Sequence, residues 1–123
     1  MRYLTDRKRA VGRGASGTGT EHHWAMIVSA IALAILVPVW LWIFGSALGS
    51  SHAEVVATFS RPFPAILTAL VLFVGMRHFA KGAHMMIEDY WQGTTRKVLM
   101  MLADAFSYLT IATGLWALAR LAL

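Results

Sequence analysis

The sequence predicts an all-α integral membrane protein with three transmembrane helices, on the basis of its composition and of three long apolar stretches. Of its 123 residues, 58% are hydrophobic and only 14% are charged, and its mean hydropathy is +0.60, well above that of soluble domains. Each apolar stretch is long enough to cross a bilayer. A polytopic chain of this length has no room for a domain outside the membrane. We therefore expect it to act in the bilayer, at its interfaces, or with partners.

The first predicted helix covers residues 24–45, WAMIVSAIALAILVPVWLWIFG, which carry no charge. At ~1.5 Å per residue this stretch crosses a ~30 Å hydrocarbon core, and Pro38 within it predicts a kink. Residues 12–20 are rich in Gly, Ser and Thr and predict a flexible, non-helical segment. The chain thus divides into a polar basic N-terminal segment, residues 1–21, and a three-helix membrane anchor domain, residues 22–123.

The second predicted helix covers residues 62–90 and the third covers residues 98–121. Pro62 and Pro64 open the second helix, where proline is tolerated because N–H groups in a first turn lack partners anyway. Residues 45–61 form a polar connection between the first two helices.

Lysine and arginine are distributed unevenly between the two sides of the predicted membrane domain. Apart from Arg77 within the second span, eight lie before the first helix or around the second connection, and two lie on the opposite side. The eight are Arg2, Arg7, Lys8, Arg9, Arg13, Lys81, Arg96 and Lys97, and the two are Arg61 and Arg120. This bias places the N-terminus and the second connection on the cytoplasmic side, or on the matrix side in a mitochondrion. Because the basic residues flank apolar segments, the net charge of +5 indicates orientation, and we exclude nucleic acid as a partner.

The chain has no cysteine, which excludes disulfides, iron–sulfur ligation and thiol chemistry. Any redox centre would therefore use histidine, methionine or a bound organic cofactor.

Polar residues within the spans need a partner or a function, because a charged residue there costs roughly 2.5–3.5 kcal/mol on insertion scales. Arg77, His78 and Asp104 are such residues, although the long side chain of Arg77 could also extend to the inner headgroups without a further function. His78 has two interpretations: a buried histidine hydrogen-bonded to a neighbouring helix, or an axial ligand of haem iron, which imidazole commonly binds. Asp89 follows 11 residues later, so a continuous helix puts both on one face about 16 Å apart.

The end of the second helix presents Tyr90 and Trp91, which are typical of membrane interfaces. An acidic pair beside them on a basic surface needs a further explanation. A phenol O–H can donate to a quinone carbonyl, and a carboxylate can orient it or relay protons. Asp89 and Tyr90 therefore form a candidate quinone site adjoining His78. His84 lies about 240° around the helix from His78 and is interpreted as an interfacial histidine.

These features resemble the hydrophobic membrane-anchor subunit of succinate dehydrogenase, respiratory complex II, in its cytochrome b-type form with three helices. The resemblance is carried by the three-span layout, by the histidine within GMRHFAKGAHMMIEDY, by the His-x10-Asp-Tyr spacing, and by SGTGTEHHW before the first helix. It implies that the three helices form part of a heteromeric helical bundle. It also implies that His78 is one axial ligand of the haem b iron, with the companion cytochrome b anchor subunit supplying the other, and that Tyr90 and Asp89 bind ubiquinone.

The resemblance further implies a succinate:ubiquinone oxidoreductase of the bacterial inner membrane, with iron–sulfur and flavoprotein subunits as partners beside membrane lipid. Succinate would be oxidised on the flavoprotein, so this chain would hold no succinate site and no catalytic residue. One feature departs from the family, which commonly carries an arginine near the start of the first helix: this chain has no Lys or Arg between Arg13 and Arg61. Arg77 is then the candidate partner for a haem propionate.

Two alternatives remain. The chain could be a non-catalytic membrane scaffold or assembly subunit without its own cofactor. A di-haem cytochrome b anchor would need more buried ligands, and the other histidines lie at predicted helix ends or in loops: His22, His23 and His52. The sequence does not identify a partner for Asp104.

Overall fold

The structure, a computed structural model, describes residues 4–12 and 19–122. Within these residues every regular element is an α-helix, and the helices are α1 (Asp6–Val11), α2 (Gly19–Ala47), α3 (His52–Phe59), α4 (Pro62–Tyr90) and α5 (Gly93–Ala122). Three of them, α2, α4 and α5, are long and apolar enough to span a membrane. The predicted fold class, all-α with three transmembrane helices, is confirmed.

Two of the spanning helices begin earlier than their apolar stretches. Gly19 and Thr20 belong to α2, so the expectation of a non-helical segment is wrong at these positions, while residues 13–18 lie outside the described part of the chain. Helix α5 begins at Gly93 although its apolar stretch begins at Val98. Hydropathy marks the part of a helix that lies in lipid, but the backbone hydrogen bonds continue into the polar flanks. Helix α4 has the range predicted for the second helix.

The short helix α3 lies in what the sequence indicated only as a polar connection. Its start is a capping box: the Ser51 N–H donates to the Glu54 carboxylate at 2.8 Å, and the Glu54 N–H donates to Ser51 Oγ at 3.4 Å. Hydrogen bonds from the Ser51 hydroxyl and from its backbone N–H lower the pKa of the exposed Glu54. Helix α1 is capped in a similar way by Thr5, whose Oγ1 accepts a hydrogen bond from the Lys8 N–H.

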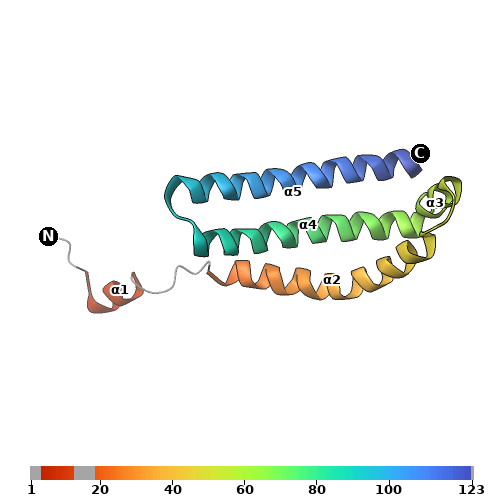
Figure 1. The fold of residues 1–123 in the computed structure, drawn as a ribbon. Coiled ribbons are helices and arrows are strands. Elements are labelled where there is room, and N and C mark those ends of the chain that lie inside the picture. Colours follow the sequence, from red (N-terminus) through yellow and green to blue (C-terminus); the bar gives the residue numbers. More distant parts are fainter. Residues whose placement is uncertain (1–3, 13–18, 123) are drawn as a thin grey trace.

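The three long helices form a single layer in which α4 lies between α2 and α5 (Figure 1). Among the described residues, no Cα atom of α2 lies within 8 Å of a Cα atom of α5. Helices α2 and α4 run antiparallel, because contacts that advance along α2 retreat along α4: Ser29 meets His78 and Trp40 meets Thr68. Helix α2 continues through Pro38, and its ribbon curves in its second half (Figure 1).

Small side chains bring α4 and α5 close together. Ser107 is completely buried, and its Oγ donates to the Met76 carbonyl at 2.8 Å. Further along the same contact, a Cβ built at Gly114 would overlap a methyl carbon of Leu72. Close approach through small residues and interhelical hydrogen bonds is how helices associate where lipid removes the hydrophobic driving force.

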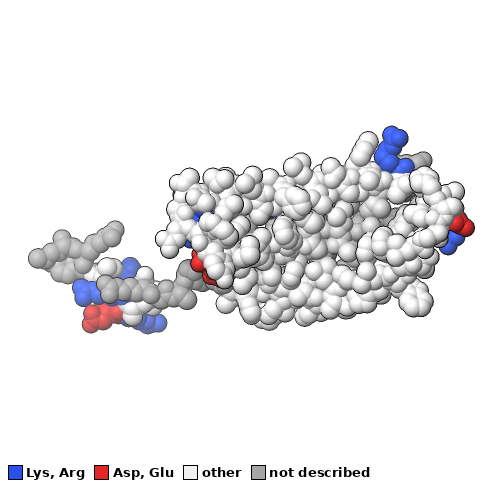
Figure 2. All heavy atoms as spheres, in the orientation of Figure 1, with Lys and Arg blue, Asp and Glu red and all other residues white. Residues whose placement is uncertain are grey.

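Most of the side chains of the layer point outward. Trp42 is 82% exposed and Trp116 is 67% exposed, far more than a water-soluble fold tolerates over a continuous surface. Figure 2 shows that the Lys, Arg, Asp and Glu atoms of the visible face gather at the ends of the layer, whereas the surface between them carries none. This surface suits lipid chains or the helices of another membrane subunit.

Candidate functional site

The candidate haem ligand His78 lies on the side of α4 that faces α2. Its Nδ1 is 2.8 Å from Ser29 Oγ, a hydrogen bond between the two helices, and its side chain is half-buried. The hydrogen bond to a neighbouring helix, which was one interpretation of this histidine, is therefore present. It occupies only one of the two ring nitrogens.

Ser29 also determines which nitrogen of His78 carries the proton. Its Oγ lies 2.7 Å from the Ala25 carbonyl oxygen and 3.0 Å from that of Met26. A hydroxyl has one proton, so both sets of contacts are hydrogen bonds only if Ser29 donates to its own helix and the Nδ1–H of His78 donates to Ser29. The lone pair then lies on Nε2, which no described residue hydrogen-bonds. Metal-ligating histidines are commonly held in this way.

A groove opens beside this hydrogen bond between α2 and α4. It has a volume of 320 Å³, and its lining includes Ala25, Ser29 and Ala32 from α2 and Phe73 and Arg77 from α4. The small side chains of α2 occur at helical spacing, so they face α4 together and leave room there. The groove is open to the outside of the layer rather than closed.

Arg77 reaches in a different direction from its neighbour His78, because consecutive residues of a helix differ by about 100°. Its Nη1–H donates to the Tyr108 hydroxyl of α5 at 2.8 Å, and its Cζ lies 5.3 Å from the centre of the Tyr108 ring. This contact gives the membrane arginine a partner within the chain. A guanidinium has five N–H donors, so the single bond to Tyr108 leaves donors for an anion.

Asp89 and Tyr90 are the last residues of α4. Both are exposed, Tyr90 to 77%, and the Tyr90 ring meets Trp91 edge-on with centroids 6.1 Å apart. Because α4 is continuous, His78 and Asp89 are separated by about 16 Å along the helix. The structure thus puts the two parts of the predicted site on one helix, one within the membrane span and one at its end, without bringing them into contact.

His84 and Asp104 form an unpredicted pair between α4 and α5. His84 Nε2 lies 3.2 Å from Asp104 Oδ2, which is close enough for an ion pair. The geometry does not make a hydrogen bond, and the buried Nε2 has none. The charges attract only when the histidine is protonated. This contact supplies the partner of Asp104 that the sequence did not identify.

Sequence reasoning missed Ser29 and Tyr108, the residues that hold His78 and Arg77. One signal was available for Ser29, the only hydroxyl-bearing residue in the apolar run 24–45. A lone hydroxyl in an otherwise apolar span is a candidate for an interhelical hydrogen bond. Tyr108 had no comparable signal, because its segment holds several polar residues.

Comparison with known proteins agrees with this architecture. A family model described as succinate dehydrogenase/fumarate reductase transmembrane subunit matches residues 1–117. The succinate dehydrogenase hydrophobic membrane anchor subunit of Paracoccus denitrificans is 49% identical over 123 residues, which are 100% of this chain and 95% of that protein. No solved structure is a significant match. The chain therefore belongs to the family of transmembrane subunits of succinate dehydrogenase and fumarate reductase.

Proposed function

We propose that this membrane anchor subunit contributes one axial ligand of haem b and part of the ubiquinone-reduction site of a succinate:ubiquinone oxidoreductase. Its partners in this proposal are the companion cytochrome b anchor subunit, the iron–sulfur subunit and the flavoprotein subunit. A location in the bacterial inner membrane is proposed from the similarity to the Paracoccus denitrificans anchor subunit. The charge bias of the sequence supports an N-terminus on the cytoplasmic side.

The hydrogen bond between His78 and Ser29 carries the proposal. It holds the imidazole through Nδ1 and leaves the Nε2 lone pair available, which is the protonation state that an iron ligand needs. Haem b would be held by His78 on one side, with the second ligand from the companion subunit, and it supplies a one-electron redox centre when bound. The residues present therefore fit this cofactor.

Arg77 is proposed as the partner of a haem propionate. Its guanidinium lies next to the ligand in the sequence, lines the groove beside Ser29 and keeps free donors after its bond to Tyr108. Arginine binds carboxylates more strongly than a neutral donor does, because the hydrogen bond is charge-assisted. A carboxylate there would also offset the cost of a cation within the span.

Asp89 and Tyr90 are proposed to bind the ubiquinone head group. A quinone takes up two electrons and two protons to become a quinol, so its site needs a hydrogen-bond donor and a route for protons. The Tyr90 hydroxyl supplies the donor, and the adjacent Asp89 carboxylate can orient it or accept and release protons. Both side chains are exposed at the end of α4, where a quinone from the membrane and a subunit docked from the water phase can both reach them.

The haem assignment is tested by the dithionite-reduced minus oxidised visible spectrum of the complex purified through a tag on this chain. We expect a b-type signal in the wild type that is lost or shifted in His78→Ala. His84→Ala is the matched control, because this histidine lies on the same helix but faces Asp104. A wild-type complex without haem would favour the alternative of a scaffold subunit without its own cofactor, and an unchanged spectrum in His78→Ala would refute the ligand assignment.

The quinone assignment is tested by Tyr90→Phe, which removes the hydroxyl and keeps the ring. We expect quinone reduction to fall at least about tenfold, the lower range for a lost proton donor, with the haem signal retained. Succinate oxidation measured with a water-soluble electron acceptor should be unchanged, because that reaction does not need the anchor site. Unchanged quinone reduction would show that Tyr90 is not part of the site.

A further inference from the structure

The opposite end of the layer from Tyr90 holds a second hollow, to which neither the proposed haem nor the proposed quinone site extends. It has a volume of 770 Å³ and is lined from three elements: Trp42, Ile43 and Ser46 of α2, Thr58 of α3, and Arg61, Pro62, Phe63 and Pro64 at the start of α4. The spans of α2 and α4 end at Ala47 and begin at Pro62. The hollow is therefore at the level where lipid headgroups meet the hydrocarbon.

One corner of this hollow is positively charged and lacks a counter-charge. Arg61 is the N-cap of α4, but its side chain caps nothing, and among the described residues it forms no ion pair. The nearest acidic residue along the chain, Glu54, has its carboxylate bound by the N–H and hydroxyl of Ser51. The guanidinium is thus available to an anion from outside the chain.

The first turn of α4 adds a backbone donor at the same place. Pro62 and Pro64 have no N–H, and the Ala65 N–H donates to the Arg61 carbonyl. The Phe63 N–H is therefore the one donor of the first turn without a partner in the described chain. It lies at the positive end of the dipole of a 29-residue helix. The helix dipole and the charge of Arg61 therefore both favour an anion at this place.

The rest of the lining is mostly apolar, and this indicates the class of ligand. Its two hydroxyl groups, those of Ser46 and Thr58, donate to the carbonyls of Ile43 and Glu54 in their own helices. The rings of Trp42 and Phe63 and the side chain of Ile43 offer nothing to a free hydrated anion. A phospholipid fits both the positively charged corner and the apolar lining. Its phosphate would lie at Arg61, and the start of its acyl chains would lie over the apolar side chains. A zwitterionic headgroup carries its own cation beside the phosphate, whereas an anionic headgroup does not. We propose that this hollow is a binding site for one phospholipid with a net negative headgroup.

The test measures lipid retained by the whole complex. The complex, purified through a tag on this chain, is incorporated into vesicles of equal parts phosphatidylglycerol and phosphatidylcholine and then extracted in mild detergent. Native mass spectrometry counts the bound lipids. We expect the wild type to retain phosphatidylglycerol in preference, and Arg61→Gln to reduce this preference about fivefold, the effect of one basic residue near an anionic lipid.

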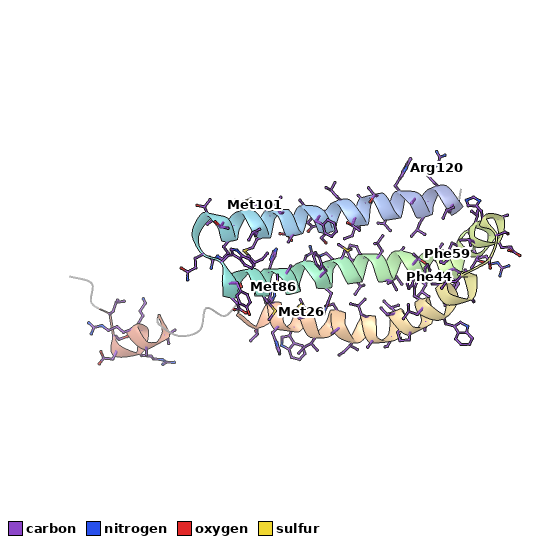
Figure 3. The ribbon with its side chains drawn as sticks, viewed as in Figure 1. Met26, Phe44, Phe59, Met86, Met101 and Arg120 are labelled. Carbon is purple, nitrogen blue, oxygen red and sulfur yellow. The ribbon has the colours of Figure 1, made fainter. Side chains whose placement is uncertain are left out.

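Arg120→Gln is the matched control. Arg120 is also an exposed basic residue at this end of the layer, but it lies in the last turn of α5 and projects away from the bundle (Figure 3). We expect this variant to keep the lipid preference. Equal losses in Arg61→Gln and Arg120→Gln would mean that only general surface charge is acting, and would overturn the proposal.

A second variant tests the shape of the hollow with its charge intact. Ser46→Phe places a large ring in the exposed lining, so we expect it to displace the lipid although Arg61 is present, and it decides the question if Arg61→Gln does not assemble. Unchanged retention in Ser46→Phe would overturn the proposal. So would a wild type without preference for phosphatidylglycerol, or displacement of the lipid by millimolar inorganic phosphate, which would indicate a site for a free anion.

Discussion

Replacing Ser29 by Ala tests the geometry that holds the proposed haem ligand. The variant removes the oxygen that accepts the Nδ1–H of His78 at 2.8 Å and leaves His78 itself unchanged. One such hydrogen bond contributes about 1 kcal/mol, or about fivefold in affinity at about 1.4 kcal/mol per tenfold. Loss of a hydrogen-bond partner behind a metal-ligating histidine typically costs about 10- to 100-fold. We therefore expect haem affinity to fall about tenfold.

The assay is haem occupancy of the purified complex at graded haem supply, together with the midpoint potential of the b-type signal. We expect the potential to rise in Ser29→Ala, because an imidazole that loses its Nδ1–H acceptor becomes a weaker electron donor. Ser46→Ala is the matched control, since this serine lies on the same helix and its hydroxyl donates only to the Ile43 carbonyl. If occupancy and potential are the same in both variants as in the wild type, Ser29 does not position His78.

Three further predictions concern the packing and caps of the helices. Gly114→Ala should lower the free energy of unfolding in mixed micelles by about 1 kcal/mol. Overpacking at the α4–α5 contact costs about 1–3 kcal/mol, and the gain in helix propensity returns about 1 kcal/mol. The control Gly75→Ala, whose added Cβ would be 3.9 Å from its nearest neighbouring atom, should not lower the free energy of unfolding. A double-mutant cycle at His84 and Asp104 should give a coupling of about 0.5–1 kcal/mol, as expected for a partly exposed pair, and no coupling would mean that the contact is incidental. The stabilisation of α3 by the Glu54 carboxylate should be complete above the usual pKa of 4.5 and lost as the pH falls through the lowered pKa of the folded state. Amide exchange in α3 measures this stabilisation. Exchange that does not depend on pH, after correction for the intrinsic rate, would contradict the prediction.

The fold was predictable because each span is recorded in a continuous run of apolar residues. Only helices and closed barrels satisfy the backbone in lipid, and apolar runs of this length fit a helix rather than a barrel strand. Length and hydropathy were therefore sufficient for α2, α4 and α5. The helix ends outside the lipid were not predictable in the same way. Gly19 and Gly93 begin helices in polar sequence, where hydropathy carries no information. The capping box of Ser51 and Glu54 was a readable signal for α3 that the hydropathy analysis did not use.

The candidate site was predictable only as far as it lies on one helix. Helical periodicity related His78 to Asp89 and Tyr90 because all three belong to α4. The partners of these side chains lie on other helices, and a single sequence does not give the register between helices. Neither Ser29 opposite His78 nor Tyr108 opposite Arg77 could therefore be assigned before the antiparallel layer was known.

The arrangement of α4 between α2 and α5 has a consequence for biogenesis. The polar side chains that cross between helices within the spans already have partners inside this one chain, such as Ser29 with His78 and Arg77 with Tyr108. The face drawn in Figure 2 carries no charged side chain between the ends of the layer, and exposed apolar side chains such as Trp42 and Trp116 accept acyl chains as readily as protein. The newly made subunit can therefore reside in the bilayer as a monomer before the other subunits arrive. Assembly then consists of exchanging annular lipid for protein on the apolar surface of the layer, without opening a helix pair.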